Sequence, residues 1–214
     1  MESFTRLYLL RHGEVESRYH RVFGGTIDME LSPLGHEQVQ GLADYLRSHP
    51  PDSIFASPMK RVQQTLAPLA KQTGKLANVL TGLREVDFGD WTGLSWDQVM
   101  DRYQVSAFEW LEQLEAGAIQ GAESTALFRE RIEFCLREIL LECPNQNVAV
   151  VCHGGVIRMF LSVLLGLPFR KMGAFDIEYA SVTRVLVRPG KVEVELLNFT
   201  PWKDLPRAAA LPTP

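Results

Sequence analysis

Short apolar runs alternate along the chain with stretches in which apolar residues recur every three to four positions. The short runs have the length of buried strands, and they predict strands at Arg6–Leu10, Ser53–Ala56, Asn78–Leu80 and Asn147–Cys152. The longer spacing predicts amphipathic helices. Their apolar faces hold Val39, Leu42, Ala43 and Leu46; Met59, Val62, Leu66, Leu69 and Ala70; Phe128, Ile132, Cys135, Leu136 and Ile139; and Val156, Ile157, Phe160 and Leu164. This alternation indicates an α/β fold, a three-layer αβα sandwich with a mostly parallel central sheet.

The last part of the chain follows a different pattern. Ser181–Val187 and Lys191–Leu197 flank Pro189-Gly190, and apolar residues alternate in both runs with a period of two. The pattern predicts an antiparallel hairpin at one edge of the sheet. Ser32-Pro33 and Ser57-Pro58 each place a capping hydroxyl before a proline suited to the first helical position, so we expect a helix to begin at each.

Residues 88–124 fit neither pattern and are rich in aromatic side chains. We expect them to form a helical, aromatic insertion over one end of the sheet. Its rings could stack on a ring-bearing ligand, or they could form a small core under the insertion. The aromatic residues are Phe88, Trp91, Trp96, Tyr103, Phe108 and Trp110. Residues 1–204 are therefore predicted to form one domain, and the Pro- and Ala-rich residues 205–214 a flexible tail.

Composition and charge exclude several classes of function. The 22 Lys and Arg against 26 Asp and Glu give a net charge of −4, whereas proteins that bind nucleic acid are normally basic. No run approaches the ~18 apolar residues of a membrane span, and the N-terminus does not resemble a signal peptide. Three cysteines are too few and wrongly spaced for a disulfide framework or a zinc site. We expect a cytoplasmic protein without metal or cofactor.

Histidines and arginines follow three of the predicted strands. Arg11-His12-Gly13-Glu14 follows the first, Ser57-Pro58-Met59-Lys60-Arg61 the second, and His153-Gly154-Gly155 the strand at 147–152. In an open α/β sheet, ligands bind outside the carboxyl ends of the strands. The sequence therefore brings two histidines and two arginines to one edge.

Each of these residues also has an ordinary structural explanation. A lone histidine at a strand end is more often a surface or core residue, Arg11 could form a salt bridge, and Gly154-Gly155 could simply turn a strand into a helix. Arg61 is harder to explain in this way, because it is expected in the first turn of a helix, where the macrodipole disfavours a cation. A bound anion would offset that cost.

The combination suits a phosphoryl group. Two guanidinium groups can hold its oxygens bidentately, and N–H groups at the start of the helix after His153 can add donors. An imidazole between two cations is expected to stay neutral, which leaves a lone pair free to attack phosphorus. No carboxylate cluster or pair of closely spaced histidines suggests a metal, so the positive charge must come from side chains.

The motifs resemble those of the histidine phosphatase superfamily, the phosphoglycerate mutase-like proteins, over roughly residues 5–165. The matching blocks are Arg11-His12-Gly13-Glu14, Gly25 with Asp28, Leu31-Ser32-Pro33-Leu34-Gly35, Ser57 to Thr65, Leu83-Arg84-Glu85, Phe88 to Gly93, Gly121-Ala122-Glu123-Ser124 and Val151 to Gly155. The resemblance implies that His12 is the nucleophile that becomes phosphohistidine. It further implies that Arg11, Arg61 and His153 complete the phosphate pocket, and that Glu85 is the acid–base residue.

Substrate binding is expected to involve Arg18, Gly24, Gly25 and Gly154 as well. Arg18 stands where many family members have Asn, and it could be a third cation for phosphate or point to solvent. Gly24 stands where Gln or Ser is common, so a side-chain contact is absent there.

Two functions share this pocket. A phosphatase passes the phosphoryl group to water, whereas a cofactor-dependent phosphoglycerate mutase passes it between hydroxyls. The family's mutases usually read Glu-Arg-His-Tyr-Gly near the acid and carry a longer insertion before the second histidine. This chain reads Glu85-Val86-Asp87-Phe88-Gly89 and resembles the small phosphatases, such as alpha-ribazole phosphatase and broad-specificity bacterial enzymes. We expect a phosphomonoester hydrolase acting on a small-molecule phosphate ester. The sequence leaves open the mutase, a non-catalytic phosphate-binding module and a homodimer.

Overall fold

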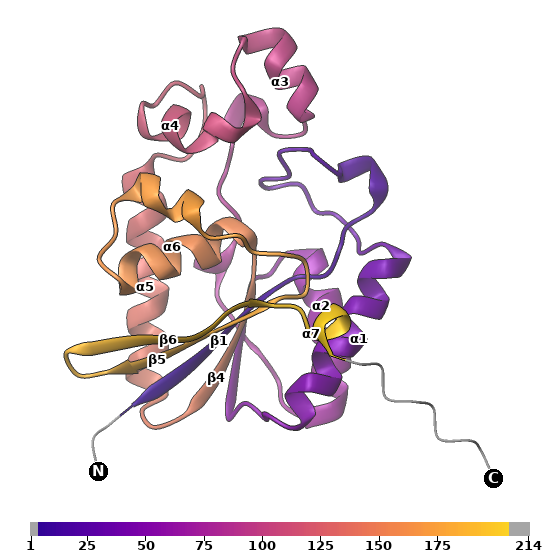
Figure 1. The fold of residues 1–214 in the computed structure, drawn as a ribbon, viewed down its shortest axis with the longest axis vertical. Helices are drawn as coiled ribbons and strands as arrows, with labels where there is room; N and C mark the ends of the chain where they lie inside the picture. The colour runs from indigo at the N-terminus through magenta and orange to yellow at the C-terminus, as the bar shows by residue number, and fades with distance from the viewer. Residues whose placement is uncertain (1–3, 206–214) are drawn as a thin grey trace.

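One six-stranded sheet forms the centre of the computed structural model, which describes residues 4–205 (Figure 1). Its strand order is β3-β2-β4-β1-β5-β6. The strands are β1 (Thr5–Arg11), β2 (Ser53–Ala56), β3 (Asn78–Val79), β4 (Asn147–Cys152), β5 (Val182–Arg188) and β6 (Lys191–Phe199). The first four run parallel, and β5 and β6 form an antiparallel hairpin beside β1. The expected mostly parallel sheet with a hairpin at one edge is confirmed.

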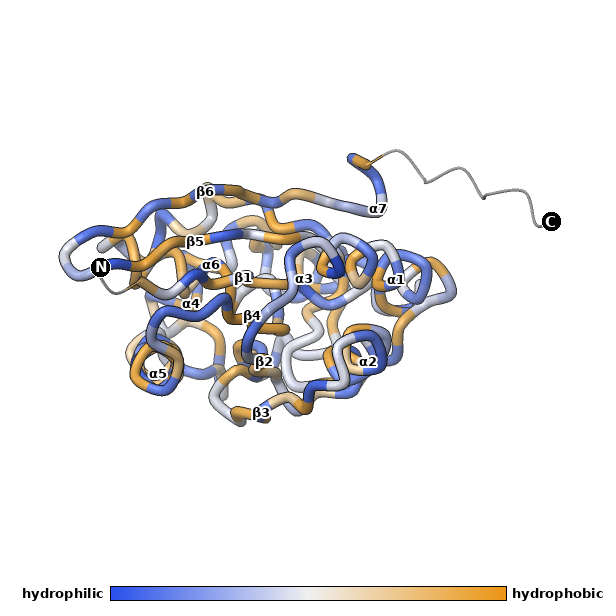
Figure 2. Tube along the Cα trace, turned by 90° about the horizontal axis from the view of Figure 1, so that it is seen from below, coloured by the Kyte–Doolittle hydropathy of each residue, from blue (hydrophilic) through white to orange (hydrophobic). Residues whose placement is uncertain are grey.

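Helices cover both faces of the sheet (Figure 2). The long ones are α1 (Pro33–Arg47), α2 (Lys60–Thr73), α5 (Thr125–Glu142) and α6 (Gly154–Leu164), and a short α7 (Pro201–Asp204) lies against α1. Alternate residues of each strand serve the two faces: Leu10 packs with α1 and α2, whereas Leu7 and Leu9 pack with α5 and α6. This is the predicted three-layer αβα sandwich. None of the helices in residues 4–205 is long and apolar enough to cross a membrane.

One of the two predicted helix caps is confirmed. The Ser32 hydroxyl accepts a hydrogen bond from the Gly35 N–H, and Pro33 opens α1. The expectation for Ser57-Pro58 is wrong, because α2 begins only at Lys60. The backbone N–H of Lys60, the first residue of α2, donates instead to the Asp28 carboxylate at 2.6 Å. Ser57 is fully buried, and its hydroxyl faces the ring of His153.

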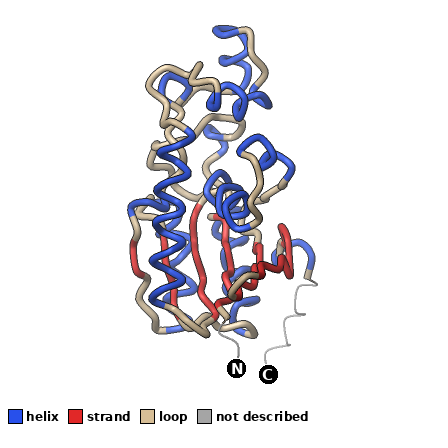
Figure 3. The backbone as a smooth tube through the Cα atoms, turned by 90° about the vertical axis from the view of Figure 1, so that its left-hand side faces the viewer, coloured by secondary structure: helices blue, strands red, loops and turns tan. Residues whose placement is uncertain are grey.

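The aromatic segment lies beyond the sheet, at the top of Figures 1 and 3. It carries α3 (Trp96–Tyr103) and α4 (Trp110–Glu115). Phe88 and Trp91 are buried and pack on Phe23, with ring centres 4.9 and 5.1 Å away. Part of the segment therefore extends the main core. Short 3-10 turns occupy Ser17–Tyr19, Thr81–Leu83, Gly89–Trp91, Ala107–Glu109 and Phe169–Ala174. The division into residues 1–204 and a tail at 205–214 stays a prediction, since the tail beyond Leu205 lies outside the described residues.

Candidate active site

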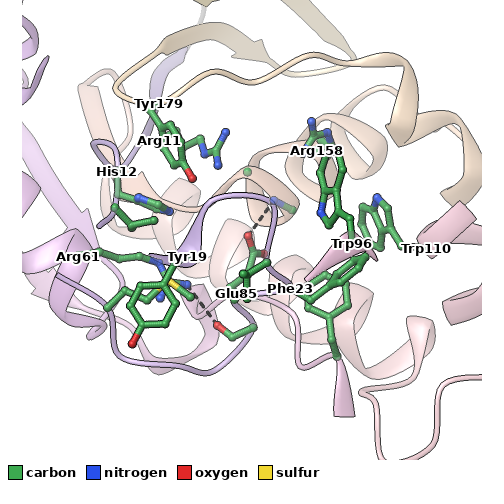
Figure 4. A pocket seen from close by; sticks show the side chains of 18 residues that line it. Arg11, His12, Tyr19, Phe23, Arg61, Glu85, Trp96, Trp110, Arg158 and Tyr179 are labelled. Carbon is green, nitrogen blue, oxygen red and sulfur yellow. Dashed lines mark hydrogen bonds between the residues drawn. The ribbon is translucent and has the colours of Figure 1, made fainter. Parts of the chain in front are cut away.

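The sheet order places three strand ends side by side. Because β4 lies between β1 and β2, the residues after these strands, His12, His153 and Arg61, come together although they are far apart in sequence. His12 and Arg61 line a cavity of about 210 Å³, which is small beside the ~300–1,000 Å³ of pockets for drug-sized ligands. Its lining includes Arg11, His12, Arg61, Glu85, Gly154 and Gly155 (Figure 4).

His12 is buried and held in one tautomer. Its Nδ1–H donates to the carbonyl of Gly13 at 2.8 Å, so Nε2 of the neutral ring carries the lone pair. Burial, and after it the charges of Arg61 and Arg11, hold the pKa of His12 well below its ordinary value. The Gly13 N–H donates to the Thr65 hydroxyl at 3.0 Å, which fixes the loop. The ring is therefore uncharged near neutral pH, as its position between two cations led us to expect, and its role as nucleophile stays a prediction.

Arg61 is almost fully buried. Its Nη1 donates to the Ile27 carbonyl at 2.7 Å, its Nη2 to the Gly25 carbonyl at 3.2 Å, and its Nε to Nδ1 of His153 at 3.2 Å. Burial lowers the pKa of Arg61, although an arginine stays charged. Three hydrogen bonds thus fix a cation at the floor of the cavity.

Arg11 is held on the other side of His12. Its Nη1 donates to the Ile177 carbonyl at 2.6 Å, and its guanidinium carbon lies 3.9 Å from the centre of the Tyr179 ring. The buried Nε has no hydrogen-bond partner. A buried donor without a partner is costly, so this N–H is available to an anion in the cavity.

His153 lies behind Arg61 and is completely buried. Because Nδ1 accepts from Arg61, Nε2–H donates to the Ser57 hydroxyl at 2.9 Å. Burial and Arg61 hold its pKa well below the ordinary value, and its ring centre is 5.3 Å from that of His12. Both ring nitrogens are engaged by protein, and His153 is not among the lining residues. Its contact with phosphate stays a prediction.

Glu85 projects from the loop before the aromatic segment and is anchored by two backbone donors. Its Oε1 accepts from the Val86 N–H and its Oε2 from the Gly155 N–H, each at 3.1 Å. A Cβ on Gly155 would lie 2.5 Å from Oε1 of Glu85. Only glycine at this position lets the start of α6 approach the carboxylate so closely.

Arg131 of α5 holds this loop in place. It donates to the carbonyls of Gly82 and Arg84 at 2.6 and 2.7 Å, and it forms an ion pair with Glu123 at 2.6 Å. Both side chains of the ion pair are largely buried. Arg131 therefore connects α5 to the loop from which Glu85 projects.

The predicted substrate-binding residues divide into two groups. Gly24, Gly25 and Gly154 line the cavity. The structure does not bring Arg18 there: its side chain is 68% exposed and pairs with Glu16 at 2.9 Å. A contact between Arg18 and substrate stays a prediction that this geometry does not support.

Sequence reasoning missed Arg158 and Tyr179, which also line the cavity. Arg158 stands four residues after Gly154 in α6, and this spacing puts both on one helix face; the spacing could have revealed it. Tyr179 precedes β5, which runs antiparallel to β1 and so begins where β1 ends. No signal in the sequence predicted that pairing.

The charged residues of the cavity are arginines and a single glutamate. Among residues 4–205, no group of three or more histidine, cysteine, aspartate or glutamate side chains gathers in a way that could hold a metal ion. The arrangement places an uncharged imidazole between two guanidinium groups, with a carboxyl group across the cavity. This combination suits transfer of a phosphoryl group.

Comparison with known proteins agrees with this geometry. The model of the histidine phosphatase superfamily (branch 1) matches residues 7–200, and the chain belongs to this family. It is 30% identical to phosphoserine phosphatase 1 of Hydrogenobacter thermophilus, over 92% of this chain and 93% of that protein. It is 24% identical to the adenosylcobalamin/alpha-ribazole phosphatase of Escherichia coli, over 90% and 95% of the two chains. The native structure of mycobacterial glucosyl-3-phosphoglycerate phosphatase superposes with a TM-score of 0.81 at 27% identity, over 92% and 99%.

Proposed function

We propose that this protein is a phosphomonoester hydrolase that acts on a small phosphorylated metabolite through a phosphohistidine at His12. The observation that carries the proposal is the neutral ring of His12 between Arg11 and Arg61, with Nε2 free and Glu85 across the cavity. The family and the phosphatase activity named for its relatives support the same reaction.

In the first step, Arg11 and Arg61 hold the phosphoryl oxygens and neutralise their charge. Nε2 of His12 attacks phosphorus, and the bond to the ester oxygen breaks. The leaving oxygen takes a proton from the carboxylic acid of Glu85, so the alcohol departs neutral. The product is phosphohistidine, still held by the two arginines.

In the second step, the Glu85 carboxylate takes a proton from water as the water oxygen attacks phosphorus. The phosphorus–nitrogen bond breaks, and His12 returns to its neutral form. Glu85 regains its proton and is ready for another ester. The arginines supply the positive charge in both steps, as phosphoryl transfer requires.

The mutase alternative is not favoured. The relatives reported above are phosphatases, and the segment Glu85-Val86-Asp87-Phe88-Gly89 departs from the mutase pattern. A non-catalytic module would need only the anion site, so it gives no reason for a carboxylate anchored by the N–H groups of Val86 and Gly155.

Trapping the intermediate tests the proposal. With a labelled phosphate ester and rapid quenching, wild type should yield an adduct that is labile in acid and stable in base. His12→Ala should form no adduct and lose several orders of magnitude in rate. The matched control is His36→Ala, since His36 is exposed on α1. Unimpaired turnover by His12→Ala would refute the mechanism.

The proposal places the reaction in the cytoplasm. All three cysteines are buried and free, which is in keeping with a reducing compartment. A homodimer stays a prediction, to be tested by the molar mass of the purified protein in light scattering.

A further inference from the structure

A glutamine of α1 lies directly behind the loop that carries His12. Gln38 is 2% exposed, and its Oε1 accepts a hydrogen bond from the backbone N–H of Glu14 at 2.8 Å. The orientation of its amide follows from this contact, because an N–H needs an acceptor and the oxygen is the acceptor of the amide group. Gln38 does not line the cavity beside His12, so the proposed reaction gives it no contact with substrate.

The peptide that Gln38 holds is the one that holds the ring of His12. The N–H of Glu14 and the carbonyl of Gly13 belong to the same peptide unit, and that carbonyl accepts from Nδ1–H of the ring at 2.8 Å. Two hydrogen bonds therefore run in series from the ring, through one planar peptide, to the side chain of Gln38. Hydrogen bonds linked in this way polarise and strengthen one another.

Packing of α1 against the loop leaves this peptide little freedom. A Cβ on Gly13 would lie 2.8 Å from the carbonyl oxygen of Gly35, and a Cβ on Gly35 would overlap the carbonyl oxygen of Glu14. The Ser32 N–H donates to the Glu14 carbonyl at 2.9 Å, and the Ser32 hydroxyl donates to the Glu14 carboxylate at 2.7 Å. The start of α1 is thus fixed against the loop, which brings Gln38, one turn after Gly35, to the Glu14 N–H.

The proposed attack puts positive charge on the ring of His12. As Nε2 shares its lone pair with phosphorus, the ring becomes cationic and its Nδ1–H becomes a stronger donor. The bond to the Gly13 carbonyl is therefore strongest in phosphohistidine, weaker in the transition state and weakest in the free enzyme. Such a bond lowers the barrier to phosphorylation, because it is stronger in the transition state than in the ground state.

We propose that Gln38 is a positioning residue for His12: by accepting from the Glu14 N–H, it orients and polarises the peptide whose carbonyl holds Nδ1–H. Nε2 then faces phosphorus, and the cationic ring is stabilised. The inference rests on the proposed function for the attack by Nε2. The phosphorus–nitrogen bond forms as the ester bond breaks, Glu85 protonates the leaving oxygen, and Nδ1 keeps its proton throughout.

Removal of the Gln38 acceptor should change the two chemical steps in opposite directions. Gln38→Met keeps nearly the same volume without the acceptor. Loss of the outer hydrogen bond of a metal-bound histidine costs about 10- to 100-fold, so phosphorylation of His12 in a single turnover should slow by about 10-fold. Hydrolysis of phosphohistidine should become up to about threefold faster, because the variant destabilises the cationic intermediate more than the transition state that follows it.

Two further measurements separate this role from a general disturbance of the cavity. Phosphorylation should slow by a similar factor with glycerol 3-phosphate and p-nitrophenyl phosphate, because Gln38 acts on the attacking ring and not on the leaving oxygen. Competitive inhibition by inorganic phosphate should change by less than about twofold, because Arg11 and Arg61 keep their contacts.

A control and a rescue variant complete the comparison. The control is Gln40→Met, which removes an exposed glutamine of the same helix together with its bond to Asp44; it should leave both steps unchanged. The rescue variant is Gln38→Glu, because a carboxyl group of nearly the same shape again offers an oxygen to the Glu14 N–H. It should recover most of the phosphorylation rate. Thermal melting shows that the variants are compared as folded proteins.

The signal of the Nδ1 proton tests the contact without turnover. In wild type with isotopically labelled histidine, the nitrogen shifts of His12 in nuclear magnetic resonance should show a protonated Nδ1 and a bare Nε2. In Gln38→Met the proton signal should move upfield, because its acceptor is less polarised. The opposite tautomer in wild type would refute the proposal even if Gln38→Met does not fold.

Three kinetic results would overturn the inference. Equal slowing of both chemical steps by Gln38→Met would mean that Gln38 only supports the loop. Slowing with glycerol 3-phosphate alone would mean that the substitution acts through Glu85. Unchanged phosphorylation would mean that the polarised peptide contributes nothing to the attack.

Failure of the proposed function gives a different result. If wild type forms no phosphohistidine with any ester, the hydrolase proposal is wrong. An upfield shift of the His12 proton in Gln38→Met would then still support Gln38 as the residue that holds the ring, and an unchanged signal would overturn both proposals. If wild type and Gln38→Met form phosphohistidine equally fast, only the role of Gln38 is wrong.

Discussion

Replacing Gly155 by alanine should displace the proposed general acid while leaving the phosphate pocket in place. The new methyl group would lie 2.5 Å from Oε1 of Glu85, and ordinary contact begins at 3.4 Å. The carboxylate must therefore move by about 0.9 Å, and its bond from the Gly155 N–H must lengthen. Gly155 is in helical conformation in α6, where alanine is favourable by about 1 kcal/mol. The fold should tolerate the change.

The expected loss follows from this displacement. A misplacement of about 1 Å can cost about 100-fold in rate, or about 2.7 kcal/mol of the barrier. The loss should appear with glycerol 3-phosphate, because an alkoxide leaves poorly unless it is protonated. With p-nitrophenyl phosphate the change should stay below about threefold, because nitrophenolate leaves with little help. Single-turnover measurement of the phosphorylation of His12 reports this step alone.

A double variant makes the reasoning refutable. Glu85→Gln should itself show the same difference between the two esters. If Gly155→Ala acts through the Glu85 carboxylate, adding it to Glu85→Gln should cost little more, and the two losses should be far from additive. Fully additive losses would mean that Gly155→Ala does not act through the Glu85 carboxylate. Equal losses of Glu85→Gln with both esters would mean that Glu85 is not the proton donor. Asp87 and Asp90 would then be the next residues to test.

Three further outcomes are expected. Because burial keeps the pKa values of His12 and His153 well below their ordinary value in the folded protein, the unfolded chain binds protons below about pH 6.5 that the folded chain does not. The free energy of unfolding should therefore fall as the pH drops below 6.5, by up to about 1.4 kcal/mol per pH unit for each histidine. Urea titrations at several pH values give the free energy of unfolding of wild type and His12→Gln. This free energy should change less steeply with pH in the variant, and an identical pH dependence would contradict the lowered pKa of His12. Arg131→Met should cost about 2 kcal/mol of stability and slow the hydrolysis of alkyl phosphates. The control is Arg129→Met, which breaks the more exposed pair with Glu133 and should cost much less stability. Equal losses of stability in the two variants would show that the contacts of Arg131 to the 82–85 loop are unimportant. EDTA should leave the rate unchanged, and recovery of a chelated, inactive enzyme by Mg²⁺ or Mn²⁺ would show that arginines alone do not supply the charge.

The sequence by itself determined the local elements and four of the five arginine, histidine and glutamate side chains that line the cavity. Hydrophobic periodicity is a local property, so the predicted strand at Ser53–Ala56 matches β2 residue for residue, and all five apolar residues assigned to the helix at 125–142 are buried. His12 and Arg61 could be assigned to one edge because they follow strands, and the carboxyl ends of parallel strands meet at one edge.

Only the tertiary structure decided which groups face one another there. Ser57 has the local sequence of a helix cap, yet it lies against His153, and Asp28, distant in sequence, takes the cap of α2. Arg158 reaches the cavity because α6 begins at the end of β4 and passes the guanidinium of Arg11. These contacts depend on the order of strands in the sheet and on the packing of helices against it. They join residues far apart in the chain, and no pattern within a single segment contains that information.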